Sequence, residues 1–216
     1  MPMPRRLRKP MHAERRRFAL ALIAALPLTA PLVFGARCAW AAPAFDLGAL
    51  MALLAGVKSG EATFVETRRI EMLDRTLVSS GRLSFKAPDV FVRETLKPRH
   101  EQLAVEGNTL TMSLGERSRT MQLDASPEAA VIVEAIRGTL TGNRGVLERL
   151  FETRVSGDAR QWSLELVPRD LRLRGQVASV RISGREQVAS EVRILLADGD
   201  HSVMTITPVR ASRAGS

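Results

Sequence analysis

The sequence predicts a mainly β domain with helices: an unclosed, strongly curved antiparallel β-barrel of about 9–11 strands with a helical lid. Two observations and one physical argument support this prediction. Short segments in which apolar and polar residues alternate recur from residue 62 to residue 207, separated by turn residues. Over residues 126–150 the apolar spacing becomes that of helices. A single sheet with this many strands must curl, and the inserted helices would cover its concave face.

The first 41 residues are predicted to be a cleaved signal peptide. A basic stretch ends at Arg17, an apolar stretch runs over 18–36, and Ala39 and Ala41 fit the small-residue cleavage pattern. We expect cleavage after Ala41, with Ala44 as the second choice. These residues carry +7 of the net charge of +9, which leaves +2 for the remainder. The charge therefore gives no support to nucleic-acid binding.

Alternatives remain open for this segment. The apolar run is nearly long enough to be an uncleaved membrane anchor, although Pro27 and Pro31 interrupt it. The RRRF stretch at 15–18 resembles a twin-arginine signal, so twin-arginine export is an alternative to general secretion.

The exported chain is predicted to contain no cysteine. Cys38 is the single Cys, and Arg37 before it does not fit a lipoprotein signal. Its removal with the signal leaves no disulfide and no thiolate metal site. Residues 42–210 are expected to form one periplasmic domain, followed by a disordered tail at 211–216.

The first half of this domain is predicted to be a helix followed by strands. Asp46 is a plausible N-cap for a helix that ends at Gly56. A long strand is expected over 62–73, and Pro88 separates the next two strands. Further turns are expected at Gly107-Asn108 and at Gly115-Glu116.

The second half returns to strands after a helical insertion. Ser126 and Pro127 give a strong helix start, Gly138 is expected to end that helix, and a second short helix is expected over 142–151. Strands follow over 161–168 and 176–184, and a hairpin around Asp198-Gly199 closes the domain.

The sequence contains no motif for catalysis, a cofactor or a metal. It lacks G-x-S-x-G, a P-loop and G-x-G-x-x-G, and we expect no enzyme. His100 is expected to be a solvated loop residue. His201 with Asp198 and Asp200 suggests a metal site, but Asp-Gly is also a standard hairpin turn, which is the favoured interpretation.

Charged residues on the long strand fit a solvated face. Glu61, Glu66 and Glu71 alternate with Arg68 and Arg69 and show no acid–base pattern. The inward parities of the strands are filled mainly by Leu, Val, Ile and Met. Such a face suits either a filled core or the lining of a space for acyl chains, which require no directional contacts.

Several segments resemble the periplasmic outer-membrane lipoprotein carriers, the LolA-like family. SGEATFVETRRIEML resembles the family's first long strand, and SSGRLSFKAPDVFVRET resembles its G-x-L-x-x-K-x-P-x-x-F segment. KPRHEQLAVEGNTLTMSL and FETRVSGDARQWSLELVPRD resemble two later segments. The likeness covers about Phe45 to Val209.

The resemblance implies an apolar cavity between the curved sheet and a helical lid. Each exposed CH₂ group costs about 0.8 kcal/mol in water, so a chain of about sixteen carbons needs shelter worth roughly 12 kcal/mol gross. The residues expected to line the cavity are Phe64, Ile70, Leu83, Phe85, Phe91, Leu110, Met112, Leu114, Met121, Leu123, Trp162, Leu164, Leu166, Val180, Ile182, Val192 and Ile194. The residues expected in the lid are Val131, Ile132, Ala135, Ile136 and Leu140.

Two positions depart from the family pattern. The family has an Arg before the Pro of the FKAP segment, where it holds the lid closed, and this chain has Ala87. An aromatic residue often follows the next Phe by two positions, and here it is Arg93. The latch is therefore missing, or rebuilt by Arg93 or Lys86. A divergent carrier of another lipid, such as a glycolipid or an acylated or polyene product, is an alternative.

The resulting hypothesis is a monomeric periplasmic carrier for the acyl chains of a lipoprotein or another lipid. An inner-membrane exporter would be the donor and an outer-membrane protein the acceptor. The alternative is a protein-interaction or sensor module on the same fold, which predicts a filled core. A lipid hydrolase would need a Ser, His and Asp site for which the sequence has no motif.

Overall fold

The computed structural model describes residues 45–209 and contains eleven strands and four α-helices in that range. The predicted signal peptide and C-terminal tail lie outside the described residues. The strands are β1 (Ser59–Ile70), β2 (Arg75–Lys86), β3 (Val90–Lys97), β4 (Glu101–Glu106), β5 (Thr109–Leu114), β6 (Arg117–Gln122), β7 (Phe151–Gly157), β8 (Trp162–Pro168), β9 (Val177–Arg185), β10 (Val188–Leu196) and β11 (His201–Pro208). The helices are α1 (Leu47–Leu54), α2 (Pro127–Leu140), α3 (Arg144–Leu150) and α4 (Leu171–Arg174).

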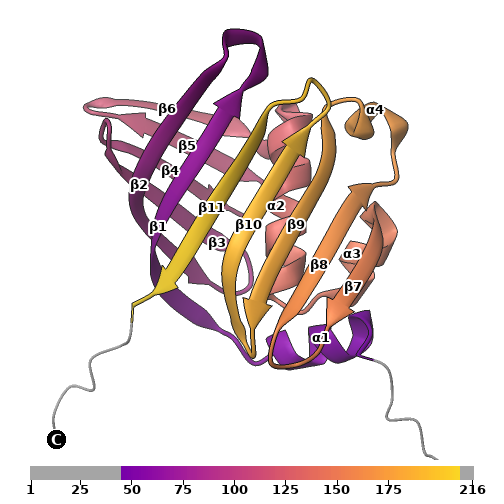
Figure 1. The fold of residues 1–216 in the computed structure, drawn as a ribbon. Helices are drawn as coiled ribbons and strands as arrows, with labels where there is room; N and C mark the ends of the chain where they lie inside the picture. Colours follow the sequence, from indigo (N-terminus) through magenta and orange to yellow (C-terminus); the bar gives the residue numbers. More distant parts are fainter. Residues whose placement is uncertain (1–44, 210–216) are drawn as a thin grey trace, which may run out of the picture. The chain divides into compact units, whose positions relative to one another are not determined.

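All the strands form one antiparallel sheet in the order β6-β5-β4-β3-β2-β1-β11-β10-β9-β8-β7. The first and last strands pair at its centre, where Ala62 lies opposite Pro208. β6 and β7 are the two edges and do not pair with each other, so the predicted unclosed barrel is confirmed. Figure 1 shows β3–β6 and α2 behind the β9–β11 strands, with α2 between the two wings of the sheet, β1–β6 and β7–β11.

The helices begin where the sequence indicates. The Asp46 carboxylate accepts a hydrogen bond from the Ala49 N–H, and the Asn143 side chain caps α3 in the same way. Pro127 occupies the first turn of α2, although the Ser126 side chain makes no capping bond. The short helix α4 was not predicted; it is capped by Asp170.

Two predicted boundaries are wrong. Gly138 does not end α2, which continues to Leu140. A Cβ at this position would lie 2.6 Å from Cδ2 of Leu147, so the glycine allows α3 to pack closely on α2. The first strand ends at Ile70 rather than at residue 73, because a 3-10 turn over Glu71–Leu73 and a left-handed Asp74 close the hairpin.

The interior divides into two clusters of buried residues. The larger lies where α1, α2 and α3 pack on β7–β10, and includes Leu50, Leu147 and Trp162. The smaller consists of Val105, Leu110 and Leu123, against which residues of the first half of α2 pack. α2 thus packs on residues of both wings of the sheet.

Candidate cavity under helix α2

A cavity of about 1000 Å³ lies between the concave face of the sheet and α2. It reaches across β1–β5 on one wing and β9–β11 on the other. Its apolar wall consists mainly of Leu83, Phe85, Phe91, Val105, Leu110, Ile132, Val133, Ile136, Leu140, Ile182, Val192, Ile194, Met204 and Ile206. The volume lies at the upper end of the roughly 300–1,000 Å³ typical of pockets that enclose small ligands.

Part of the predicted lining set borders this cavity. The residues that do so are Leu83, Phe85, Phe91, Leu110, Ile182, Val192 and Ile194. The rings of Phe85 and Phe91, on paired strands, lie with centroids 4.9 Å apart. These aromatic side chains form a continuous wall on the β2–β3 side.

The other predicted lining residues lie elsewhere. Trp162, Leu164, Leu166 and Val180 belong to the larger core cluster, because α1, α2 and α3 fill the concave face over β8 and β9. Phe64 is buried beneath Arg93, Ile70 is half-buried at the end of β1, and Met121 and Leu123 pack in the smaller cluster. Met112 and Leu114 are partly exposed beside the cavity.

The predicted lid residues divide between two faces of α2. Ile132, Ile136 and Leu140 border the cavity. Val131 and Ala135 are buried in the larger core cluster. α2 therefore covers the cavity with one side and holds the core together with another.

A partly buried ion pair lies in the cavity wall. The Arg93 guanidinium donates a hydrogen bond of 2.6 Å to the Glu66 carboxylate, and both contact the Ser79 hydroxyl. Arg93 also lies 4.7 Å above the centre of the Phe64 ring. Because Glu66 is only 9% exposed, its interpretation as part of a solvated face is wrong. The alternation along the strand could have indicated this burial, because Glu66 lies on the same strand face as Phe64 and Ile70.

Neither residue predicted to rebuild the latch forms a hydrogen bond with α2. Arg93 is bonded to Glu66 and Ser79 on the sheet, and Lys86 is exposed. The Ala87 N–H donates to the Lys58 carbonyl, within the strand region. α2 itself supplies an arginine: the Arg137 guanidinium donates a 2.7 Å bond to the Gly107 carbonyl in the β4–β5 turn, and pairs with Glu134 at 3.2 Å. This contact was not predicted from the sequence, because it joins residues 30 positions apart.

The cavity becomes polar near the β1–β2 hairpin. Arg68, Arg99, Glu101 and His201 border it there. Asp200 accepts a hydrogen bond from the Glu71 N–H and lies 3.8 Å from Arg68. The expected Asp198-Gly199 turn is present, with Gly199 at a φ of 95°. Within residues 45–209, no group of three His, Cys, Asp or Glu side chains is placed to hold a metal ion.

The fold and the cavity together define an open antiparallel barrel that encloses apolar space beneath a helix. A family model described as "Outer membrane lipoprotein carrier protein LolA-like" matches residues 39–206. The chain belongs to this LolA-like family. A comparison with curated proteins found no match. Between residues 45 and 209, no helix has the length and apolar character needed to cross a membrane.

Three solved structures similar to this chain share little sequence with it. A LolA superfamily protein from Nitrosomonas europaea has 11% identity and a TM-score of 0.41, over 76% of this chain and 93% of that one. A DUF1329 family protein from Desulfovibrio piger has 11% identity and a TM-score of 0.46, over 80% and 93%. LprF from Mycobacterium bovis has 8% identity and a TM-score of 0.35, over 79% and 96%.

Proposed function

We propose that this protein is a periplasmic carrier that shelters the acyl chains of a lipoprotein or another lipid. The observation that supports this proposal is the apolar cavity of about 1000 Å³ beneath α2. Membership of the LolA-like family supports the same role. Acyl chains gain from leaving water and demand no directional partners, which suits a wall of Leu, Ile, Val, Met and Phe side chains.

The proposal includes transfer from the inner toward the outer membrane, with an exporter as donor and a second protein as acceptor. A carrier of this kind needs an enclosed apolar space and a cover that opens, and α2 is the only segment of residues 45–209 that contacts both wings of the sheet while bordering the cavity. The proposed transfer of lipid requires no catalytic step. Loading the protein with lipid and then adding acceptor vesicles tests transfer directly.

The decisive experiment is native mass spectrometry with lipid extraction on protein produced from the full chain and exported to the periplasm. We expect a bound acyl species. In the variant Leu83→Glu we expect the affinity for offered lipid to fall by roughly tenfold or more, because a carboxylate then stands in the apolar wall. Leu83 lies opposite Arg93 in the sheet, so the new charge has a cationic neighbour and the fold is expected to survive.

Val65→Glu is the matched control. Val65 lies on the same wing, on strand β1, but is 52% exposed and does not border the cavity. The Val65→Glu variant should bind lipid with the affinity of the wild type. An empty wild-type protein that takes up none of the offered lipids would contradict the proposal and favour the partner-binding alternative.

A further inference from the structure

A second hollow adjoins the cavity, on the concave face over β3–β6. It has a volume of about 500 Å³, and its walls include Arg93, Thr95, Glu101 and Leu103, which also border the cavity. The two spaces therefore adjoin along the sheet, with these four residues between them. We call this second space the arginine groove.

The floor of the groove is apolar and open. Met112 and Leu114 on β5 are 38% and 43% exposed, although they lie on the same face of the sheet as the cavity wall. In register across the sheet, Arg93 on β3 is followed by Leu103, Met112 and Arg119 on β4, β5 and β6. Strand spacings of about 4.8 Å place Arg119 roughly 14 Å from Arg93 along this row.

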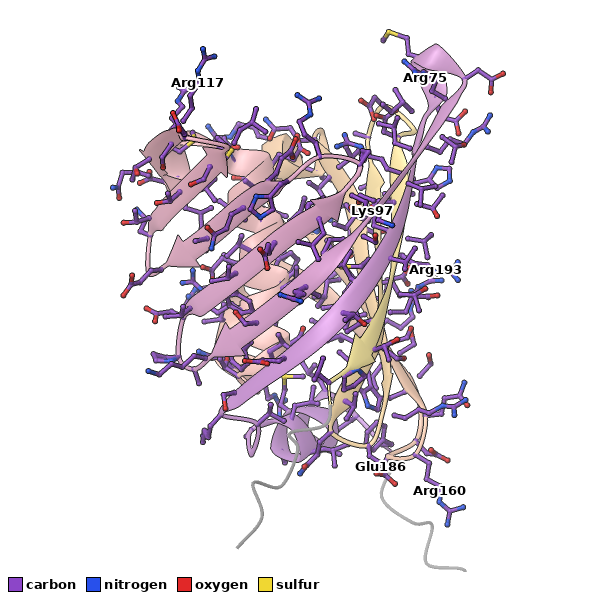
Figure 2. All side chains as sticks on the ribbon, turned by 90° about the vertical axis from the view of Figure 1, so that its left-hand side faces the viewer. Arg75, Lys97, Arg117, Arg160, Glu186 and Arg193 are labelled. Carbon is purple, nitrogen blue, oxygen red and sulfur yellow. The ribbon has the colours of Figure 1, made fainter. Side chains whose placement is uncertain are left out.

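The far wall of the groove is cationic. Arg117 and Arg119 both stand on β6, opposite Leu114 and Met112. Among residues 45–209, neither arginine has a carboxylate within 4.0 Å, whereas Arg93 is paired with Glu66. Glu101, the carboxylate in the groove, lies 4.0 Å from Arg99. Figure 2 shows Arg117 projecting from the upper edge of the domain.

We propose that the arginine groove receives the anionic headgroup of the lipid whose chain enters the cavity. The cargo is then an anionic amphiphile with a phosphate or carboxylate group, and this inference rests on the proposed function. Guanidinium groups bind phosphate and carboxylate oxygens with two parallel hydrogen bonds. One molecule reaches both spaces, because the apolar floor between the β6 arginines and the cavity supports the first part of its chain.

The test compares two lysolipids with the same palmitoyl chain: lysophosphatidylglycerol, which is anionic, and lysophosphatidylcholine, which has no net charge. Protein produced from the full chain is titrated with each below its micelle concentration. We expect the anionic lipid to bind roughly fivefold tighter at low salt, as two exposed charge contacts permit. The preference should shrink at high salt.

The double variant Arg117→Gln and Arg119→Gln should remove the preference and leave the affinity for lysophosphatidylcholine unchanged. Arg160→Gln with Arg185→Gln is the control, since both residues are exposed, removal of both changes the net charge equally, and Arg160 lies at the opposite end of the domain (Figure 2). This control should keep the full preference.

Different failures have different meanings. Equal affinity of the wild type for both lipids, or a preference that survives the double variant, overturns this inference and leaves the proposed function intact. Binding of neither lipid overturns both. Binding of poly-glutamate that depends on Arg117 and Arg119 and does not compete with lysolipid would assign the groove to an acidic protein partner instead, which also overturns the inference.

Discussion

The ion pair between Glu66 and Arg93 in the cavity wall is the most distinctive feature at the scale of single residues. Glu66 and Arg93 come from strands that are separated by β2, and Ser79 on β2 bridges them. Burying either charge alone is costly, whereas the pair with its hydroxyl partner satisfies both. The pair thus gives β1, β2 and β3 a fixed polar contact beside the cavity.

Replacing Glu66 by Gln should lower the free energy of unfolding by about 1–2 kcal/mol, because Arg93 is then left without its anion in a partly buried site. Adding Arg93→Met should recover part of this loss. Urea unfolding of the single and double variants measures the coupling between the two residues. Strictly additive losses would show that the two side chains are energetically independent.

At the scale of elements, α2 is held unequally on its two sides. One side, with Val131 and Ala135, belongs to the large cluster with α1 and α3. Ala129 and Val133 pack instead on a cluster of only three buried side chains. Arg137 adds one bond from the helix to the β4–β5 turn. The helix is therefore anchored firmly on the β7–β10 side and weakly on the β4–β6 side.

Replacing Arg137 by Met should weaken the attachment of α2 to the β4–β6 wing by about 1–2 kcal/mol, the worth of a hydrogen bond from a charged donor. Hydrogen exchange should accelerate for α2 amides and much less for β8 and β9. Arg144→Met is the control, because Arg144 forms a comparable ion pair with Glu148 on the surface of α3. Equal α2 exchange in wild type and Arg137→Met would show that this bond does not hold the lid.

At the scale of the whole molecule, a cavity of this size leaves apolar side chains without packing partners when it is empty. A ligand that fills the cavity should stabilise the folded state by mass action. At one hundred times its dissociation constant, a bound lipid adds about 2.7 kcal/mol. The melting temperature should then rise by roughly 5–10 °C for a domain of this size.

Differential scanning fluorimetry of delipidated protein with increasing palmitoyl lysolipid measures this effect. The Leu83→Glu variant should show a smaller shift at the same lipid concentration. A melting temperature that does not depend on lipid in the wild type would contradict the carrier proposal at this scale.

Local signals in the sequence predicted the elements well. Asp46 caps a helix, Pro127 begins one, and Asp198-Gly199 turns a hairpin, because each of these preferences is decided by neighbouring residues. Gly138 failed as a helix terminator because its role is set by Leu147, on the next helix. Helix propensity describes the single residue and does not report its contact with another helix.

The site was predicted less completely than the fold. Alternation identified the concave face correctly for Leu83 and for Leu164, but it did not show that helices fill the space over Leu164 and leave space over Leu83. Arg137 and Glu66 were missed for a related reason. Their roles depend on partners that lie far away in the sequence.

The pairing of β1 with β11 has a consequence for how the protein is made. Within residues 45–209, every other strand pairing joins neighbours in the chain, so each wing is a meander that needs only local contacts. The central pairing must close a loop of nearly the whole domain, which makes it entropically expensive and slow. Because β1 and β11 both border the cavity, the cavity is complete only after β11 has paired with β1. A chain that lacks β11 would therefore have the local pairings of its two wings but no complete cavity.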